Sequence, residues 1–229
     1  AEFRPIAHGG IRTWVVPQIT KTIWWDQSGK EVKRSGKSVR TPNEKWYGEP
    51  GLTWNQIKET SKRFGYYSGG LFSVNSLMLF PTQEKSIWKM MGILNSDLYQ
   101  CLVLSQTVER HWMTDIIGSL PWIEELEEIP DIEKLAKEIY KTVVRLRVHD
   151  PVSPYYVGPA LLPNTGSFCY QHPHAIKMQA EMEKIHSDKS QRESLRSIAI
   201  KSEKELDKSL SRIESIIELI NNSIYDKLS

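Results

Sequence analysis

The sequence has few cysteines and no long apolar stretch. Its 229 residues include only Cys101 and Cys169, too few for the disulfide framework of a small secreted domain. Apolar runs stay well short of the roughly 18–20 residues that cross a bilayer. The first residues, Ala1-Glu2-Phe3-Arg4-Pro5, lack the apolar core and the cleavage site of a signal peptide. We therefore expect a cytoplasmic protein with no membrane partner.

Enzyme motifs are equally scarce. The sequence contains neither a phosphate-binding glycine motif nor a Gly-x-Ser-x-Gly elbow. Ser153-Pro154-Tyr155-Tyr156 is similar to the tetrapeptide with which amino-methyltransferases grip a flipped base, but Tyr155 stands where a second proline belongs. No strand with a Gly-rich turn precedes it to bind S-adenosylmethionine. We interpret the tetrapeptide as a Pro-rich turn and expect no catalytic residue and no cofactor on this chain.

One cluster of Cys and His residues has metal-ligand character. Cys169, His172 and His174 offer three ligands of tetrahedral type. A fourth ligand would have to come from a distant residue such as Cys101 or His111. We expect a surface loop here rather than a metal site, and zinc binding is the open alternative.

Charge and tryptophan are distributed unevenly. Residues 1–80 contain 12 Lys and Arg against 6 Asp and Glu, whereas residues 81–229 contain 18 against 22, and all eight tryptophans lie at or before Trp122. Cations neutralise phosphates and aromatic rings stack on bases, so this mixture predicts a nucleic-acid partner. The alternative is a small sandwich with a tryptophan core and a solvated basic rim. The interleaved residues are Trp14, Trp24, Trp25, Lys30, Lys33, Arg34, Lys37, Arg40, Trp46, Tyr47 and Trp54.

The first half has the residue pattern of strands and turns. β-Branched and aromatic residues at 11–16 and 20–25 predict strands, and residues 26–30 predict a hairpin turn. Residues 34–43 contain almost no apolar side chain, which is typical of a loop. We also expect a short helix at 53–62 and a buried strand at 71–80.

The second half has the periodicity of helices. Apolar residues recur every three or four positions over 87–102, where Asn95-Ser96 interrupts the pattern and could cap a second helix. Another helix is expected at 132–146, and a Pro-rich connector at 151–173. The last helix has a heptad seam that needs a partner helix, either within the chain or on a neighbour. The seam residues are Leu206, Leu210, Ile213, Ile217, Ile220 and Ile224.

These elements predict an α+β fold of two parts. Residues 1–122 form a β-rich mixed domain with short helices. Residues 123–229 form a helical region with the connector and a long C-terminal helix.

Five short blocks stand in order along residues 4–122: His8-Gly9-Gly10-Ile11-Arg12-Thr13-Trp14, residues 25–33, Gly51-Leu52-Thr53-Trp54 followed by Phe64-Gly65-Tyr66-Tyr67, Met91-Gly92-Ile93-Leu94-Asn95-Ser96, and Asp115-Ile116-Ile117-Gly118-Ser119-Leu120-Pro121. Together these blocks resemble a known family, the TaqI-like C-terminal specificity domain of adenine-specific DNA methyltransferases. Fused restriction–modification enzymes and BREX-system methyltransferases carry such target-recognition domains. In the family, the last of these blocks is a strand that closes the domain.

The resemblance implies that this chain is a C-terminal piece of an enzyme that recognises double-stranded DNA. S-adenosylmethionine and the base-flipping pocket would belong to the methyltransferase domain of the parent chain, a site-specific adenine methyltransferase, and endonuclease activity of that parent is an open alternative. We expect Trp14 and Trp54 in the core. The phosphate ligands would be Arg12, Lys37, Arg40, Lys62 and Arg63, and the residues that reach base edges would be Arg40, Asn43, Thr60, Ser61, Tyr66 and Tyr67. Tyr66 stands where the family often has Arg or Lys, and His8 where Lys is common.

Two other functions fit the same sequence. One is half of a type I restriction specificity subunit, which also pairs a recognition domain with a long helix. The other is a helical protein–protein interaction scaffold, in which the heptad seam is the functional surface and mediates self-association, while the basic loops are merely solvated.

Overall fold

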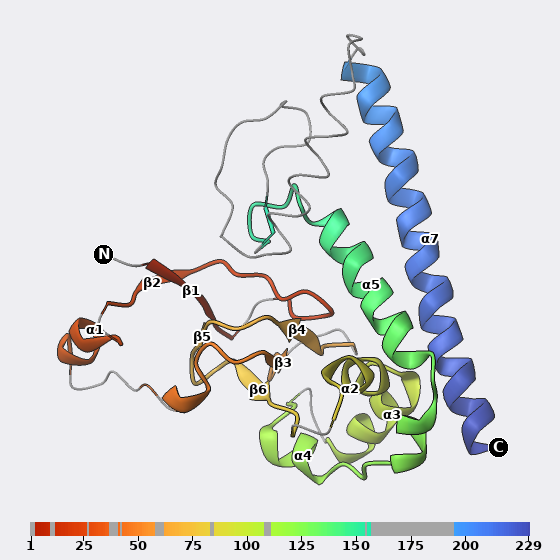
Figure 1. Ribbon diagram of the computed structural model, residues 1–229, viewed down its shortest axis with the longest axis horizontal. Helices are drawn as coiled ribbons and strands as arrows, with labels where there is room; N and C mark the ends of the chain where they lie inside the picture. Colours follow the sequence, from red (N-terminus) through yellow and green to blue (C-terminus); the bar gives the residue numbers. More distant parts are fainter. Residues whose placement is uncertain are drawn as a thin grey trace.

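The computed structural model describes residues 3–9, 12–26, 28–36, 41, 43–57, 62–82, 85–107, 111–153, 155–156 and 195–229, with side chains from 203 onward in the last range. Its fold is α+β: two small sheets lie in the N-terminal half and helices make up most of the rest, including one long C-terminal helix (Figure 1). The predicted fold class is therefore confirmed. Among the described helices, none combines the length and apolarity needed to span a bilayer.

Each sheet has three strands. The first has the order β2-β1-β5, with β1 (Phe3–Ala7) antiparallel to β2 (Thr22–Trp24) and parallel to β5 (Leu71–Phe72). The second has the order β4-β3-β6, in which β3 (Gly51–Trp54) pairs antiparallel with both neighbours. The strands β4 and β6 cover Gly65–Tyr67 and Leu77–Leu79.

The loop of residues 12–17 packs on the edge of the second sheet. Val15 donates its N–H to the Phe64 carbonyl oxygen at 3.0 Å, and Tyr66 donates to the Val15 carbonyl oxygen at 2.9 Å. This approach needs glycine at position 65, since a Cβ there would overlap the carbonyl oxygen of Thr13. Residues 11–16 were expected to form a strand. Among those described, only Val15 makes a β-bridge, so that prediction is wrong.

Three further predictions for the first half are wrong. The expected hairpin at 26–30 is instead a turn into the short helix α1 (Lys30–Arg34), because Ser28 and Gly29 adopt the left-handed region with φ of 60° and 76°. The expected helix at 53–62 is not present in its described residues, 53–57 and 62: Thr53 lies in strand β3, where its hydroxyl donates to the Leu77 carbonyl oxygen across the sheet. Residues 58–61 lie outside the described part. The expected strand at 71–80 is two strands, because a turn closed by the Ser76 N–H and the Ser73 carbonyl oxygen separates β5 from β6.

The expected helices of the second half are present. Helix α2 (Ile87–Leu94) ends just before Ser96, whose hydroxyl caps α3 (Asp97–Gln106) by accepting from the Tyr99 N–H at 3.4 Å. Helix α5 spans Ile132–Leu146 and helix α7 spans Leu195–Leu228. The predicted interruption at Asn95-Ser96 and the helix at 132–146 are thus confirmed.

Three short helices complete the described part. They are η1 (Glu44–Trp46), α4 (Thr114–Ser119) and η2 (Glu124–Glu128). Helix α4 lies where the family resemblance implied a closing strand, so that expectation is wrong. Its Ile117 side chain is buried, with Ile116 and Leu120 partly exposed, so one apolar edge of the turn packs inward.

Helix α5 lies at the centre of the helical part. It packs against α2 on one side and against α7 on the other (Figure 1). A single core cluster runs from Val15 and Trp54 in the first half to Ile216 and Ile224 on α7, and therefore includes residues on both sides of the expected boundary after Trp122.

The heptad seam of α7 is only partly occupied within the chain. Its later residues Ile213, Ile220 and Ile224 are buried, while Leu206 and Leu210 are 44% and 46% exposed. The fully buried residue of this helix, Ile216, lies beside the predicted seam position Ile217, which is partly exposed. The partner helix of the later seam is α5.

Residues 151–153 and 155 form a turn, in which the Ser153 hydroxyl accepts from the Tyr155 N–H at 3.1 Å. The Tyr155 ring is buried beside Tyr140, and the hydroxyls of these two residues share a hydrogen bond. The rest of the expected connector, together with Cys169, His172 and His174, lies outside the described residues. Within the described part, no group of three His, Cys, Asp or Glu side chains is placed to hold a metal ion.

Candidate nucleic-acid interface

Cationic side chains surround the lobe formed by residues 22–36 and 43–50, which we call the α1 lobe. It lies at the end of the molecule opposite α7 (Figure 1). Lys30, Lys33, Arg34 and Lys45 are all exposed there. The left-handed turn at Ser28 and Gly29 starts the helix that carries three of them. Gly29 also permits the Trp25 ring to pack directly against the turn, where a Cβ would overlap it.

Aromatic rings form the inner layer of this lobe. Trp25 is buried and meets the edge of Tyr47, with ring centroids 5.6 Å apart, and Tyr47 meets the edge of Phe72 at 4.9 Å. Trp46 stacks on Phe80 at 4.7 Å with the ring planes 12° apart. Because these contacts lie under the lobe, they fix the outer surface to the first sheet.

Two tryptophans of the lobe keep a large exposed fraction. Trp24 and Trp46 are 45% and 38% exposed. The Lys45 ammonium lies 5.3 Å from the centroid of the Trp46 ring, and Lys33 lies 5.8 Å from that of Trp25. A cation beside an exposed indole is a combination that can meet a phosphate and a base together.

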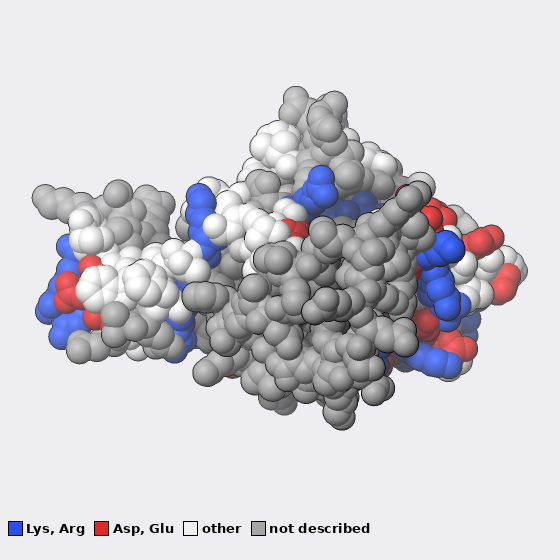
Figure 2. Space-filling model, turned by 90° about the horizontal axis from the view of Figure 1, so that it is seen from above, with Lys and Arg blue, Asp and Glu red and all other residues white. Residues whose placement is uncertain are grey.

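Carboxylates neutralise part of the positive charge of the lobe. Glu44 accepts from Lys33 at 2.7 Å and from the Thr41 hydroxyl, and the hydrogen bond from Lys33 is the main cause that lowers the pKa of Glu44. Arg34 lies 3.5 Å from Glu31. Among the described residues, Lys30 and Lys45 have no ion-pair partner. Figure 2 shows this mixture of basic and acidic side chains at the left end of the molecule.

An apolar hollow of about 270 Å³ opens between the lobe and the first sheet. Trp25, Tyr47 and Phe72 form its aromatic walls, and Val32 of α1 closes it from the lobe side. The hollow is lined by few polar groups, among them Thr41 and Ser73.

Two of the sequence-predicted site residues, Arg12 and Asn43, are exposed. Arg12 lies in a loop that Gln18 closes by donating its backbone N–H to the Arg12 carbonyl oxygen at 2.8 Å. Asn43 has φ of 61° and stands at the left-handed turn that precedes η1, a conformation that asparagine adopts more readily than most residues.

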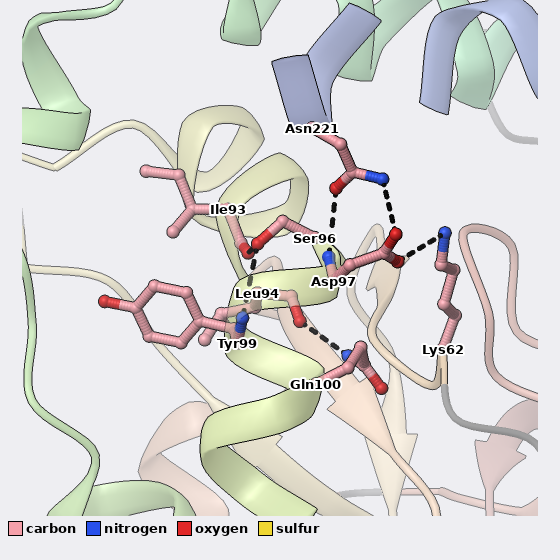
Figure 3. Close-up of polar contacts among 8 residues, drawn as sticks. All are labelled: Lys62, Ile93, Leu94, Ser96, Asp97, Tyr99, Gln100 and Asn221. Carbon is pink, nitrogen blue, oxygen red and sulfur yellow. Dashed lines mark hydrogen bonds and ion pairs between the residues drawn. The ribbon is translucent and has the colours of Figure 1, made fainter. Parts of the chain in front are cut away.

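Lys62 belongs to a polar clamp between three elements (Figure 3). Its ammonium lies 3.3 Å from Asp97 Oδ1 at the start of α3. Asn221 of α7 donates from Nδ2 to Asp97 Oδ2 at 2.8 Å and accepts at Oδ1 from the Asp97 N–H at 3.0 Å. Lys62 is therefore partly buried and engaged with protein in this structure.

Arg63 is a buried residue. It is 3% exposed, its guanidinium lies 4.1 Å from the centroid of the Trp112 ring, and its Nη1 donates to the carbonyl oxygens of Asn55 and Gln56 at 3.4 Å. Burial lowers the pKa of Arg63 to about 10, so the side chain stays charged at neutral pH.

The two predicted tyrosines also contact protein. Tyr66 stacks on Trp88 at 4.5 Å and meets the edge of Tyr140 at 5.4 Å. Burial raises the pKa of Tyr66. The Tyr67 hydroxyl donates to the Leu71 carbonyl oxygen at 2.9 Å, and the ring is buried. The remaining predicted site residues, Lys37, Arg40, Thr60 and Ser61, lie outside the described residues.

Four exposed residues are candidate ligands in the structure although the sequence did not single them out as ligands. These are Lys30, Lys45, Trp24 and Trp46 of the α1 lobe. The interleaving of Trp24, Lys30 and Trp46 was visible in the sequence, but nothing in it separated the two exposed rings from the buried Trp25. Trp54 is buried, as expected. As for known proteins, neither a scan against protein-family models nor a search of the curated proteins finds a match to this chain.

Proposed function

We propose that this chain is a DNA sequence-recognition domain, the C-terminal part of an N6-adenine DNA methyltransferase or restriction–modification enzyme. It binds duplex DNA and reads base edges, while the parent chain supplies S-adenosylmethionine and the chemistry. The observation that carries the proposal is the surface of the α1 lobe. There the exposed indoles of Trp24 and Trp46 accompany Lys30 and Lys45, two cations with no ion-pair partner among the described residues.

Physical reasons connect this surface to DNA. Lysines release counterions from phosphates, which supplies affinity without sequence preference. Asn43, which is exposed just before η1 in the same lobe, would reach base edges once phosphates fix the register, and the exposed Arg12 would be a further phosphate ligand. The resemblance of the sequence blocks to target-recognition domains supports the same assignment.

The test is the salt dependence of binding to duplex DNA, measured by fluorescence anisotropy. We expect binding at low salt that weakens by a decade or more at moderate salt, because several phosphates are engaged. The variant K30Q/K45Q should flatten the plot of log K against log salt by about 0.9 for each phosphate that the variant no longer neutralises. The control K204Q/K208Q removes two exposed lysines from α7 and should leave the slope unchanged. A wild-type chain that binds no duplex at low salt would contradict the proposal.

The second candidate is the helical interaction scaffold. Exposed Leu206 and Leu210 favour it, because they continue the seam of α7 beyond its contact with α5. That function predicts no DNA binding together with self-association that L206E/L210E abolishes in sedimentation velocity.

A further inference from the structure

Helix α5 carries a row of cations on its exposed face. Lys134, Lys141 and Arg145 are all exposed and are separated by seven and four residues. At 3.6 residues per turn these side chains lie within about 40° of one another around the helix axis. The opposite face holds the buried Ile132 and Ile139, which pack in the core.

The acidic residues next to this row are already engaged. Glu133 accepts from Lys137 and, at 3.0 Å, from the Ser86 hydroxyl. Glu138 accepts from Arg212 of α7 at 2.7 Å. Among the described residues, none forms an ion pair with Lys134, Lys141 or Arg145. The row therefore presents three uncompensated positive charges, although the second half of the chain is acidic as a whole.

The shape of the row suits an extended polyanion. From Lys134 to Arg145 it measures about 16 Å along the helix axis, given a rise of 1.5 Å per residue. A hollow of about 510 Å³ follows the same face and is lined by Pro130, Glu133, Lys134, Lys137, Glu138 and Lys141. One strand of duplex DNA places a phosphate every 3.4 Å or so along its axis, so a row of this length spans several phosphates.

A membrane surface fits this face less well than DNA. A helix that binds in the lipid interface must insert its apolar face among the acyl chains. The apolar face of α5 is buried in the core. The exposed residues of this helix are all cationic: Lys134, Lys141 and Arg145. The row thus offers charge without an apolar anchor.

We propose that Lys134, Lys141 and Arg145 bind phosphates of the DNA backbone, as a second contact surface distinct from the α1 lobe. This inference rests on the proposed DNA-binding function. The row sets the position of the duplex and reads no sequence, because phosphates are the same at every base pair. The end of α5 adjoins the loop of Arg12, since Arg147 donates to the Val16 carbonyl oxygen.

The test compares two double variants that remove the same amount of positive charge at two different sites. K141Q/R145Q removes two cations four residues apart on α5, and K204Q/K208Q removes two cations four residues apart on the exposed first part of α7. Glutamine keeps the helix propensity of lysine and arginine, so circular dichroism and thermal unfolding should match the wild type in both. Binding is measured by anisotropy with a 20-base-pair duplex over a salt series, and with vesicles that contain phosphatidylserine.

We expect K141Q/R145Q to flatten the salt slope by about 1.8 and to weaken duplex binding roughly tenfold or more at 0.1 M salt, with the control unchanged. Two duplexes of unrelated sequence should show the same loss. An unchanged slope in K141Q/R145Q, with wild-type binding intact, overturns this inference and leaves the proposed function standing. Equal losses in both variants reveal a general charge effect and also overturn it. Wild-type binding to the vesicles but not to the duplex overturns both proposals.

Discussion

At the scale of single residues, basic side chains have opposite environments in the first half of this protein. Lys30 and Lys45 are exposed, whereas Arg63 is buried against Trp112. The sequence alone indicates Arg63 as a phosphate ligand, because the ring that buries this residue comes from a distant position. A planar guanidinium suits this place, since it stacks on an indole and donates sideways to two carbonyl oxygens.

The buried position of Arg63 leads to a prediction about stability. Arg63→Ala should lower the free energy of unfolding by about 2–4 kcal/mol, because two carbonyl oxygens lose a donor and the Trp112 ring loses its packed cation. Urea denaturation monitored by tryptophan fluorescence measures this change. Lys45→Ala, at an exposed site, should stay within about 0.5 kcal/mol of the wild type. A stable Arg63→Ala variant that fails to bind DNA would instead make Arg63 a ligand.

At the scale of elements, the clamp around Asp97 holds three parts of the chain together. It joins the start of α3, the residue Lys62 and the last third of α7 through Asn221 (Figure 3). An asparagine amide can donate and accept at once, which lets it satisfy both the carboxylate and the N–H of Asp97. The clamp therefore fixes the rotation of α7 about its own axis relative to α3, because a seam of isoleucines alone would let the helix shift.

Replacing the amide tests the clamp. Asn221→Ala should lower the free energy of unfolding by about 1–3 kcal/mol, because two hydrogen bonds to Asp97 are removed at a nearly buried position. Asn221→Asp should cost more, since it places a second carboxylate against Asp97. The neighbouring exposed residue provides the control, and Asn222→Ala should change the thermal midpoint little. If all three variants have the same free energy of unfolding as the wild type, the clamp contributes nothing to stability.

The elements also show how far the sequence predicts this fold. Helices α2, α3 and α5 were predictable, because their apolar residues recur with the helical period and Ser96 stands at a cap position. Strand β2 lies within the strand expected at 20–25. The bounds and pairing of the other strands were not predictable, because each has two to five residues and gains its partners from remote segments, as Leu52 does from Tyr66 and Leu79. Helix α1 depends on the left-handed turn at Ser28 and Gly29, which a hairpin would use equally well.

The candidate site was less predictable than the fold. Interleaved Lys and Trp indicate a surface for nucleic acid, but only those that are exposed in the fold can contact a ligand. Tyr66 resembles a base reader in the sequence and stacks on Trp88 in the structure. The cations of α5 were not predicted as ligands because their half of the chain is acidic. The row is uncompensated because Glu133 and Glu138 pair with other residues, which only the structure shows.

At the scale of the whole molecule, one hydrophobic core joins the second sheet to the helices. Val15 and Phe64 belong to the same cluster as Ile139 of α5 and Ile216 of α7. A core shared in this way favours cooperative unfolding, in which no part melts alone. A separate small cluster consists of Ala7, Tyr67 and Phe72, and Tyr47 of the α1 lobe packs against it. The surface of the lobe can therefore vary without disturbing the main core.

Cooperativity can be tested because all eight tryptophans lie at or before Trp122, while α7 has none. Ile216 is completely buried on α7, and Ile216→Ala should lower the free energy of unfolding by about 2–5 kcal/mol through the cavity it leaves. If the core is one unit, this loss shifts the tryptophan fluorescence transition and the helical circular dichroism transition by the same amount in urea. Leu219→Ala, at a position 47% exposed on the same helix, should shift neither by more than about 1 kcal/mol. A fluorescence transition that stays at the wild-type midpoint in Ile216→Ala would mean that α7 unfolds separately from the tryptophan-rich half.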